Sequence, residues 1–332
     1  MHRLTPERAE QLLQSVAEVH VLVIGDIMLD RQISGTAERI SPEAPVPVVT
    51  VSGEDASLGG AANVAANIVA MGASCSLVGL CGSDESATRL REELKRLGID
   101  DTLLFEAEGR PTTTKTRVMA GHHQVVRVDR ENTADIQEAQ ASAVLESVHG
   151  LIAEADAVVL EDYNKGLLVP SVVTAVLSAS AKAGIPTVVD PKRLRFFEYG
   201  GATIFKPNAR ELSDALGEAI HPDDPDWMET VRARLNCRGL LVTLGGSGMA
   251  LKVDGMDYMR VPTVARSVFD VSGAGDTVTA ALAVSLAAGA SQIEAALMAN
   301  HAAAIEVERA GVATVRPPDI IDHIVRLHSK SD

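Results

Sequence analysis

The sequence predicts an α/β fold with a central, mostly parallel sheet flanked by helices, and three observations lead to it. Short apolar runs alternate with helix-like segments along most of the chain, which is typical of parallel sheets covered by helices. Acidic residues stand at the ends of three apolar runs, at Asp26, Asp162 and Asp190, and such sheets bind ligands beyond the carboxyl ends of their strands. Two β-branched segments, 31–52 and 111–130, interrupt the alternation and predict a small separate sheet.

The elements of the main sheet follow one another regularly. A polar helix over about 6–16 precedes a buried strand at 19–24. A helix over 170–182 is expected to stop at Gly184, because a glycine past the last turn, with proline two residues further on, ends helices. Ala-rich periodicity from residue 290 onward indicates two closing helices. The other expected strands are 75–80, 157–160, 187–189 and 240–244.

The two interrupting segments are rich in turn residues and lack helical periodicity. The second has the pattern of a hairpin that turns at 121–123. Together the segments predict a lid, a small sheet lying over the main one, although two plain surface hairpins would give the same pattern. No internal repeat and no linker divides the chain, so we expect residues 1–332 to form a single domain that carries the lid.

Composition excludes several classes of function. The chain has 332 residues with 45 acidic and 30 basic side chains, a formal net charge of −15, which is unsuited to non-specific nucleic-acid binding or to docking on an anionic membrane. No apolar run reaches the roughly 18 residues of a membrane span. The N-terminus lacks the apolar core of a secretion signal, so a cytoplasmic protein is expected. The three cysteines form no CxxC pair and are expected to be reduced packing residues.

The motif with the clearest chemistry is DVSGAGD at 270–276, directly before a long apolar helix. Its small residues allow successive backbone N–H groups to converge at the helix N-terminus, which binds anions. Asp276 has two interpretations at this point. It could stabilise the helix dipole, or it could accept a proton from a hydroxyl that attacks a bound phosphate.

Other motifs are less specific on their own. The chain has neither a Walker A sequence nor a GxGxxG turn. Gly59 and Gly60 allow close approach of another group, and Asn63 could start a helix or bind a hydroxyl. Asp26 and Asp30 follow the first strand and could bind sugar hydroxyls, a metal or solvent.

Taken together, GGAAN near the N-terminus and DVSGAGD near the C-terminus resemble the two signatures of the ribokinase-like (PfkB) carbohydrate kinases. The resemblance covers almost the whole chain, with LEDYNKG, VDPK, KPNARE and VTLGGSGM in the family's order. Within that family, GDIMLDR, RISPEAPVPVV and TTTKTRV look like kinases of D-glycero-D-manno-heptose 7-phosphate. Such kinases supply ADP-heptose for the lipopolysaccharide core. Many are fused to a nucleotidylyltransferase half, and this chain resembles the single-function form.

The resemblance implies a ribokinase-like fold and roles for individual residues. It implies transfer of the γ-phosphoryl of Mg·ATP to the anomeric hydroxyl, with Asp276 as catalytic base and the backbone of Gly273, Ala274 and Gly275 as anion hole. It implies that the nucleotide is bound by Asn208, Glu211 (holding Mg²⁺ through water), Gly245, Gly246, Gly248 and Asn300. On the sugar side it implies Asp30, Gly59, Gly60 and Asn63, with Asp162 at its strand end expected beside them. Three residues depart from the family's pattern: Glu161, Arg193 and Lys206.

A phosphorylated substrate requires local positive charge in so acidic a chain. Lys192 follows Asp190 at a strand's carboxyl end, and Lys115 and Arg117 are two apart on a lid strand and hence on one face. We expect these three cations to hold the substrate phosphate, with Lys192 and Arg117 favoured because they lie in strings shared with the heptose-phosphate kinases. Arg193 and Arg195 lie outside those strings. The alternative is that such cations are solvated or paired with carboxylates.

Two further expectations concern assembly and rival functions. Exposed lid edges with valines such as Val46, Val48 and Val118 favour a homodimer through the lid, because uncovered strand edges aggregate. The alternatives to a heptose-phosphate kinase are a related kinase of another sugar, such as a fructose phosphate or ribose, and a non-catalytic sugar- or nucleotide-binding regulator.

Overall fold

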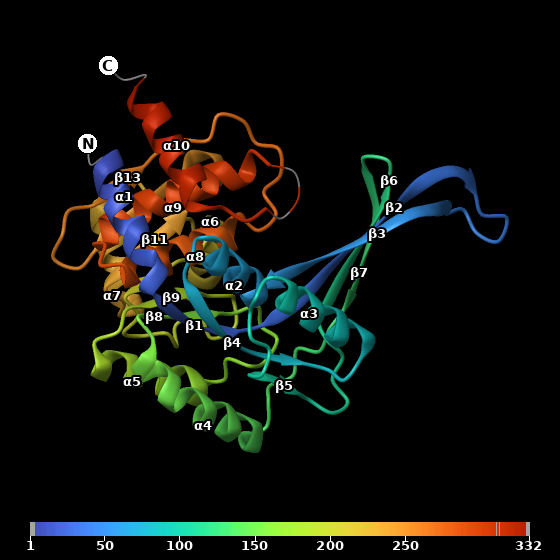
Figure 1. Ribbon diagram of the computed structural model, residues 1–332, viewed down its shortest axis with the longest axis horizontal. Helices are drawn as coiled ribbons and strands as arrows, with labels where there is room; N and C mark the ends of the chain where they lie inside the picture. Colours follow the sequence, from blue (N-terminus) through green and yellow to red (C-terminus); the bar gives the residue numbers. More distant parts are fainter. Residues whose placement is uncertain (1–3, 310, 312, 330–332) are drawn as a thin grey trace.

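A computed structural model describes residues 4–309, 311 and 313–329, and it shows a large sheet between two layers of helices with a second sheet extending from one side (Figure 1). The main sheet has nine strands, and every neighbouring pair is parallel except β11–β12 and β12–β13. In spatial order the strands are β13 (Met259–Val261), β12 (Met249–Val253), β11 (Gly239–Thr243), β10 (Ile204–Phe205), β9 (Thr187–Asp190), β8 (Ala157–Glu161), β1 (His20–Gly25), β4 (Ser74–Cys81) and β5 (Leu104–Glu106).

Helices cover both faces of this sheet, which confirms the predicted α/β architecture of a mostly parallel sheet flanked by helices. One layer contains α1 (Pro6–Ser15), α2 (Ala61–Ala70), α3 (Glu85–Arg96), α8 (Ala274–Ala287), α9 (Gln292–Val307) and α10 (Pro317–His328). The other contains α4 (Glu138–Glu154), α5 (Pro170–Ala183), α6 (Ala209–Leu216) and α7 (Pro225–Leu235). Short 3₁₀ turns lie at η1 (Val16–Glu18) and η2 (Gly245–Ser247). The helix expected at 170–182 ends as predicted, with Gly184 in the left-handed conformation at φ 72°.

Strand β1 shows why the apolar runs form the centre of the sheet. Val21 and Val23 belong to the apolar core on one side, and Leu22 and Ile24 belong to the core on the other. A strand buried on both faces needs apolar residues throughout and not in alternation. None of the described helices is long and apolar enough to cross a membrane.

The second sheet is the predicted lid, and it differs from the prediction in extent. Its strands are β2 (Ile27–Ile40), β3 (Pro47–Gly60), β6 (Thr114–Ala120) and β7 (His123–Arg130), in the order β3-β2-β6-β7. Because β2 pairs with β6, the two segments form one sheet and not two separate hairpins. The first segment is longer than the expected 31–52, since both of its strands continue toward the main sheet, where their ends are buried. The prediction of a sheet lying over the main one is also wrong in position, because the lid projects away from the body (Figure 1).

The register of the lid separates its residues into two faces. Asp30, Lys115 and Asp129 lie side by side across β2, β6 and β7, so they share one face. Ile33, Val118 and Val126 lie side by side on the opposite face. One face of the lid is therefore charged, and the other carries these apolar residues together with an ion pair between Arg31 and Glu54 at 3.1 Å.

Candidate active site

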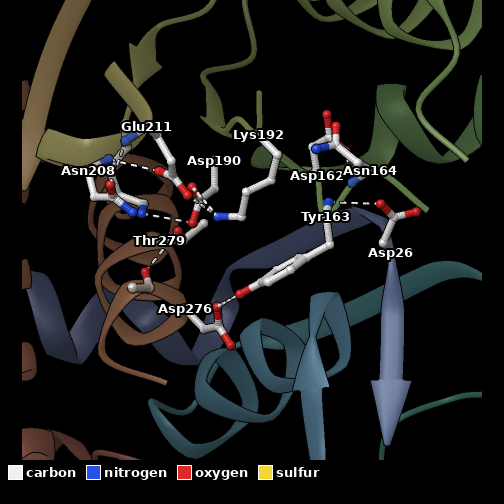
Figure 2. A network of polar contacts seen from close by, with 12 residues as sticks. Asp26, Asp162, Tyr163, Asn164, Asp190, Lys192, Asn208, Glu211, Asp276 and Thr279 are labelled. Atoms are coloured by element: carbon white, nitrogen blue, oxygen red, sulfur yellow. Dashed lines mark hydrogen bonds and ion pairs between the residues drawn. The ribbon is translucent and has the colours of Figure 1, made fainter. Parts of the chain in front are cut away.

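Asp276 lies at the start of α8, where the chain folds back sharply. Gly273 precedes the helix with φ 92°, a left-handed conformation that glycine adopts readily. The Asp276 side chain is buried, and both of its oxygens accept hydrogen bonds from other parts of the chain. Asn63 Nδ2 donates to Oδ2 at 2.8 Å. The Tyr163 hydroxyl donates to Oδ1 at 2.9 Å (Figure 2). These contacts hold the carboxylate across the fold and do not cap its own helix.

The glycine-rich turn leaves the first N–H groups of α8 without helical partners. A side-chain carbon at Gly275 would lie 3.9 Å from Lys206 Nζ and 4.0 Å from Asp190 Oδ2. Glycine therefore keeps open the space between the helix N-terminus and a lysine. Backbone N–H groups, the helix dipole and this ammonium together favour an anion there. The expected anion hole of Gly273, Ala274 and Gly275 stays a prediction, and the Ala274 N–H donates to the Val271 carbonyl at 3.4 Å.

Three carboxylates and two lysines surround this space. Glu161, Asp190 and Asp276 each have an oxygen within 4.8 Å of the others. Lys206 Nζ lies 2.8 Å from Asp190 Oδ2, and Lys192 Nζ lies 3.7 Å from Asp190 Oδ1. Glu161 and Lys206, which depart from the family's pattern, thus lie beside the expected base.

The charges of this cluster shift the pKa values of its carboxyl groups. Burial raises the pKa of Asp276 to about 6, against the opposing hydrogen bonds from Asn63 and Tyr163. Burial, together with the charges of Asp190 and Asp276, raises the pKa of Glu161 well above its usual range, which favours its neutral form. Burial also acts to raise the pKa of Asp190, but Lys192 and Lys206 outweigh it and lower that pKa. The site therefore contains an ionised carboxylate at Asp190, a neutral carboxyl group at Glu161, and Asp276, whose pKa is about 6.

A largely apolar cavity of about 450 Å³ lies on one side of Asp276, between η2, α6, α8 and α9. Its lining includes five of the six residues expected on the nucleotide side, namely Asn208, Gly245, Gly246, Gly248 and Asn300, together with Ala274 and Gly275 of the turn. Glu211 lies in the first turn of α6. Its Oε2 accepts the Asn208 N–H at 2.9 Å, and Asn208 Oδ1 accepts the Glu211 N–H at 2.8 Å. Asn300 Nδ2 donates to the Pro262 carbonyl at 2.9 Å.

The residues expected on the sugar side gather where the lid meets the body. Arg117 donates to Asp30 at 2.8 Å. A side-chain carbon at Gly59 would lie 2.6 Å from Asp30 Oδ2, and one at Gly60 would lie 2.4 Å from the Asp26 carbonyl oxygen. The two glycines therefore make room for the Asp30 side chain and for the Asp26 backbone.

Two carboxylates at strand ends, Asp26 and Asp162, accept hydrogen bonds from other groups of the protein. Asp26 Oδ2 accepts the backbone N–H groups of Tyr163 and Lys165, both at 2.8 Å. Asp162 accepts the Tyr199 hydroxyl and the Asn164 N–H, both at 2.7 Å. These contacts fix the loop that follows β8, and direct contact of Asp162 with the sugar remains a prediction.

The cations expected to hold phosphate differ in how they are paired. Lys192 donates to Glu211 Oε1 at 2.6 Å, on the nucleotide side. Arg195 pairs with Asp135. Lys115 has no carboxylate within 4.0 Å among the described residues, and its Nζ lies 5.1 Å from the centre of the Tyr163 ring. Because Lys192 and Arg117 are each paired with a carboxylate, Lys115 is the most available for a substrate phosphate of the three cations Lys115, Arg117 and Lys192.

Sequence reasoning gave no role to Tyr163, whose hydroxyl contacts the expected base. The available signals were its place after a strand and two acidic residues, and its presence in the LEDYNKG string of the family resemblance.

Comparison with known proteins agrees with this geometry. Among solved structures, Arabidopsis thaliana ribokinase complexed with ribose and ATP has a TM-score of 0.71 at 21% identity, covering 92% of this chain and 98% of that one. Escherichia coli phosphofructokinase-2 has a TM-score of 0.73 at 19% identity, covering 93% and 99%. At such identities the similarity shows the fold, which is that of the ribokinase-like class.

The chain belongs to the pfkB family of carbohydrate kinases, whose family model matches residues 19–319. It is 43% identical over 329 residues to the bifunctional protein HldE of Pelobacter propionicus, covering 97% of this chain and 67% of the relative. It is 46% identical over 300 residues to HldE of Azorhizobium caulinodans, covering 89% and 62%. The chain thus spans about two thirds of the length of these relatives. The enzyme class expected from the motifs is confirmed.

Proposed function

We propose that the chain transfers the γ-phosphoryl group of ATP to the anomeric hydroxyl of D-glycero-D-manno-heptose 7-phosphate, giving the 1,7-bisphosphate in ADP-heptose biosynthesis for the lipopolysaccharide core. The observation that carries the proposal is the position of Asp276. It lies between the cavity lined by Asn208 and Asn300 and a group formed by Asn63 on α2 and by Asp30 and Lys115 on the lid strands. The similarity to HldE proteins and the RISPEAPVPVV and TTTKTRV strings support heptose phosphate as the substrate.

The residues around Asp276 suffice for in-line phosphoryl transfer. The helix N-terminus and Lys206 would stabilise negative charge on the transferred group, and Asp276 would receive the proton of the attacking hydroxyl. The bond from the sugar oxygen to the γ-phosphorus forms as the bond to the ADP oxygen breaks, with the electron pair leaving on ADP. Positioning and electrostatics supply most of the rate enhancement in such reactions.

The oxygen donors beside the anion hole fit a hydrated magnesium ion. Asp190 Oδ1 is buried and has no hydrogen-bond partner in the described part of the chain, and Glu211 is connected to Asp190 through Lys192. Hard cations of this kind prefer carboxylate and water oxygens. Glu211, acting through water, and Asp190 would hold Mg²⁺, which when bound neutralises charge on the nucleotide phosphates.

The proposal is tested by ADP release from Mg·ATP across a panel of sugars. The panel contains heptose 7-phosphate, unphosphorylated heptose, fructose 6-phosphate, fructose 1-phosphate and ribose. We expect heptose 7-phosphate to give the highest kcat/KM. A higher value for fructose phosphate or ribose would assign the chain to another sugar, and a higher value for unphosphorylated heptose would remove the argument for phosphate recognition.

The pH dependence follows from the pKa of Asp276, which burial raises to about 6. A general base must be ionised, so kcat/KM should fall about tenfold per pH unit below that value as Asp276 becomes protonated. The sugar phosphate itself loses its second proton near pH 6, which would confound the profile. The residual activity of Asp276→Asn provides the control, because it should lack the part of the fall that belongs to Asp276. Identical profiles for the two proteins would contradict this assignment.

We further propose that the protein is a homodimer that pairs through the apolar face of the lid. Val126 and Val128 are 47% and 54% exposed on that face, and Val46, at the tip, is 51% exposed. Val48 and Val118 are half-buried within the single chain. Pairing across a two-fold axis would cover this face.

The expected mass by light scattering is twice the 34.9 kDa of one chain at micromolar concentration. The double substitution Val126→Glu/Val128→Glu should give monomers, because it places charge in the apolar contact. His122→Glu, in the turn of the same hairpin, adds charge outside that face and should leave the dimer intact. A monomeric wild-type protein would rule out the lid dimer.

A further inference from the structure

The Tyr163 hydroxyl is hydrogen-bonded to the carboxylate of Asp276, the group that the acceptor substrate would need. A general base must lie within hydrogen-bond reach of the hydroxyl that it deprotonates, and here the Oδ1 atom of Asp276 already accepts the Tyr163 hydroxyl at 2.9 Å (Figure 2). The Oδ2 atom accepts Asn63 Nδ2 at 2.8 Å. A phenol O–H and a sugar O–H are the same kind of donor, and a sugar hydroxyl that approaches Oδ1 would have to share this buried oxygen with Tyr163 or replace it.

Of the two side chains that donate hydrogen bonds to Asp276, Tyr163 is the one that can move away. Asn63 is buried in the first turn of α2, and Asn67 Nδ2 donates to its side-chain and backbone oxygens at 3.3 and 3.0 Å. Tyr163 is half-buried and lies in the loop after β8. Its backbone is fixed by the bond from its N–H to Asp26 at 2.8 Å, so the ring can swing while the loop stays in place.

Two lysines hold the ring on Asp276. Lys115 Nζ and Lys192 Nζ lie 5.1 and 4.6 Å from the ring centre, distances at which an ammonium attracts an aromatic face. Lys115 belongs to lid strand β6, next to Asp30 in the register. An acceptor that draws Lys115 toward its own phosphate would weaken the hold on Tyr163, so the cation that recognises the substrate also retains the ring.

We propose that Tyr163 is a gate on the acceptor side: without sugar its hydroxyl occupies Asp276 in place of water, and the bound sugar displaces it. The proposal rests on the proposed function. It concerns a side reaction that every such kinase has to limit. If water reached Asp276, the carboxylate could take its proton while the water oxygen bonded to the γ-phosphorus and the bond to ADP broke, releasing ADP and phosphate. A phenol bound to Asp276 excludes that water.

Tyr163→Phe tests the gate, since phenylalanine keeps the ring between the lysines and removes only the hydroxyl. Without sugar, ADP release from Mg·ATP should rise at least about tenfold over wild type, the order of effect of one charge-assisted hydrogen bond. With saturating sugar phosphate, kcat for transfer should stay within about threefold of wild type. Tyr258→Phe, which removes a hydroxyl that contacts Asp223 outside the site, should change neither rate.

A second measurement needs no variant. An analogue of heptose 7-phosphate that lacks the anomeric hydroxyl, added to wild type at concentrations that inhibit transfer, should displace Tyr163 without supplying an acceptor. ADP release should then rise several-fold above the sugar-free rate. If Tyr163→Phe shows the wild-type rate of sugar-free ADP release, or loses both hydrolysis and transfer, the gate is wrong. The sugar-free arm requires no acceptor, so this outcome is distinct from failure of the panel assay, in which wild type would not phosphorylate heptose 7-phosphate.

Discussion

Asp276→Asn should lower turnover with sugar phosphate by about 10²- to 10⁴-fold, the range expected when a general base is removed. Asparagine preserves the size of the side chain and can still bond with Asn63 and Tyr163, but it cannot accept the proton of the attacking hydroxyl. The affinity for ATP should change little, because backbone N–H groups at the start of α8 and Lys206 are expected to hold the phosphates. The measurements are kcat by ADP release and Kd for ATP by titration.

The alternative role for Asp276 is charge stabilisation of the α8 dipole, and a matched variant separates the two roles. Asp224, which caps α7 by accepting the N–H groups of Asp226 and Trp227 at 3.0 and 3.2 Å, is a carboxylate at a helix start outside the site. Asp224→Asn should leave kcat unchanged, since asparagine also caps helices. If Asp276→Asn retained a third of the wild-type kcat, Asp276 would be a helix-capping charge and not the base.

The main sheet was predictable because its central strands are buried on both faces. The runs 19–24, 157–160 and 187–189 each correspond to a strand within about a residue at either end. Strands β10 and β13 have two and three residues and carry no periodic pattern. They exist because neighbouring strands supply their hydrogen bonds. The extent of the lid was underestimated for a different reason, since the buried ends of β2 and β3 do not resemble an exposed hairpin.

The site was predictable where the chemistry is local in sequence. The turn at 270–276 contains its own glycines, its helix start and Asp276. The contact between Asn63 and Asp276 joins residues 213 positions apart and arises from the packing of α2 on α8. Lys206 gave no sign of burial, because a lysine is buried only where a partner such as Asp190 exists, and the fold alone brings Asp190 to it. Tyr163 was missed for the same reason.

Lys115→Met should raise KM for heptose 7-phosphate about 10- to 150-fold, the cost of one charge-assisted hydrogen bond to phosphate. Methionine keeps the unbranched chain and removes the charge. Burial lowers the pKa of Lys115, although nearby Asp30 opposes this, and a substrate phosphate in contact would favour its charged form further. KM for ATP should be unchanged, because Lys115 lies on lid strand β6 and does not line the cavity proposed for the nucleotide.

Two comparisons make this prediction specific to phosphate. With unphosphorylated heptose, Lys115→Met should behave like wild type, since the lost bond has no partner on that substrate. Lys192→Met should instead affect ATP as well as sugar phosphate, because Lys192 Nζ bonds Glu211 at 2.6 Å on the nucleotide side. Arg117→Met should raise KM for both sugars, since it also releases Asp30. Equal losses with phosphorylated and unphosphorylated heptose in Lys115→Met would mean that Lys115 acts only through the lid or the Tyr163 ring and does not bind the phosphate.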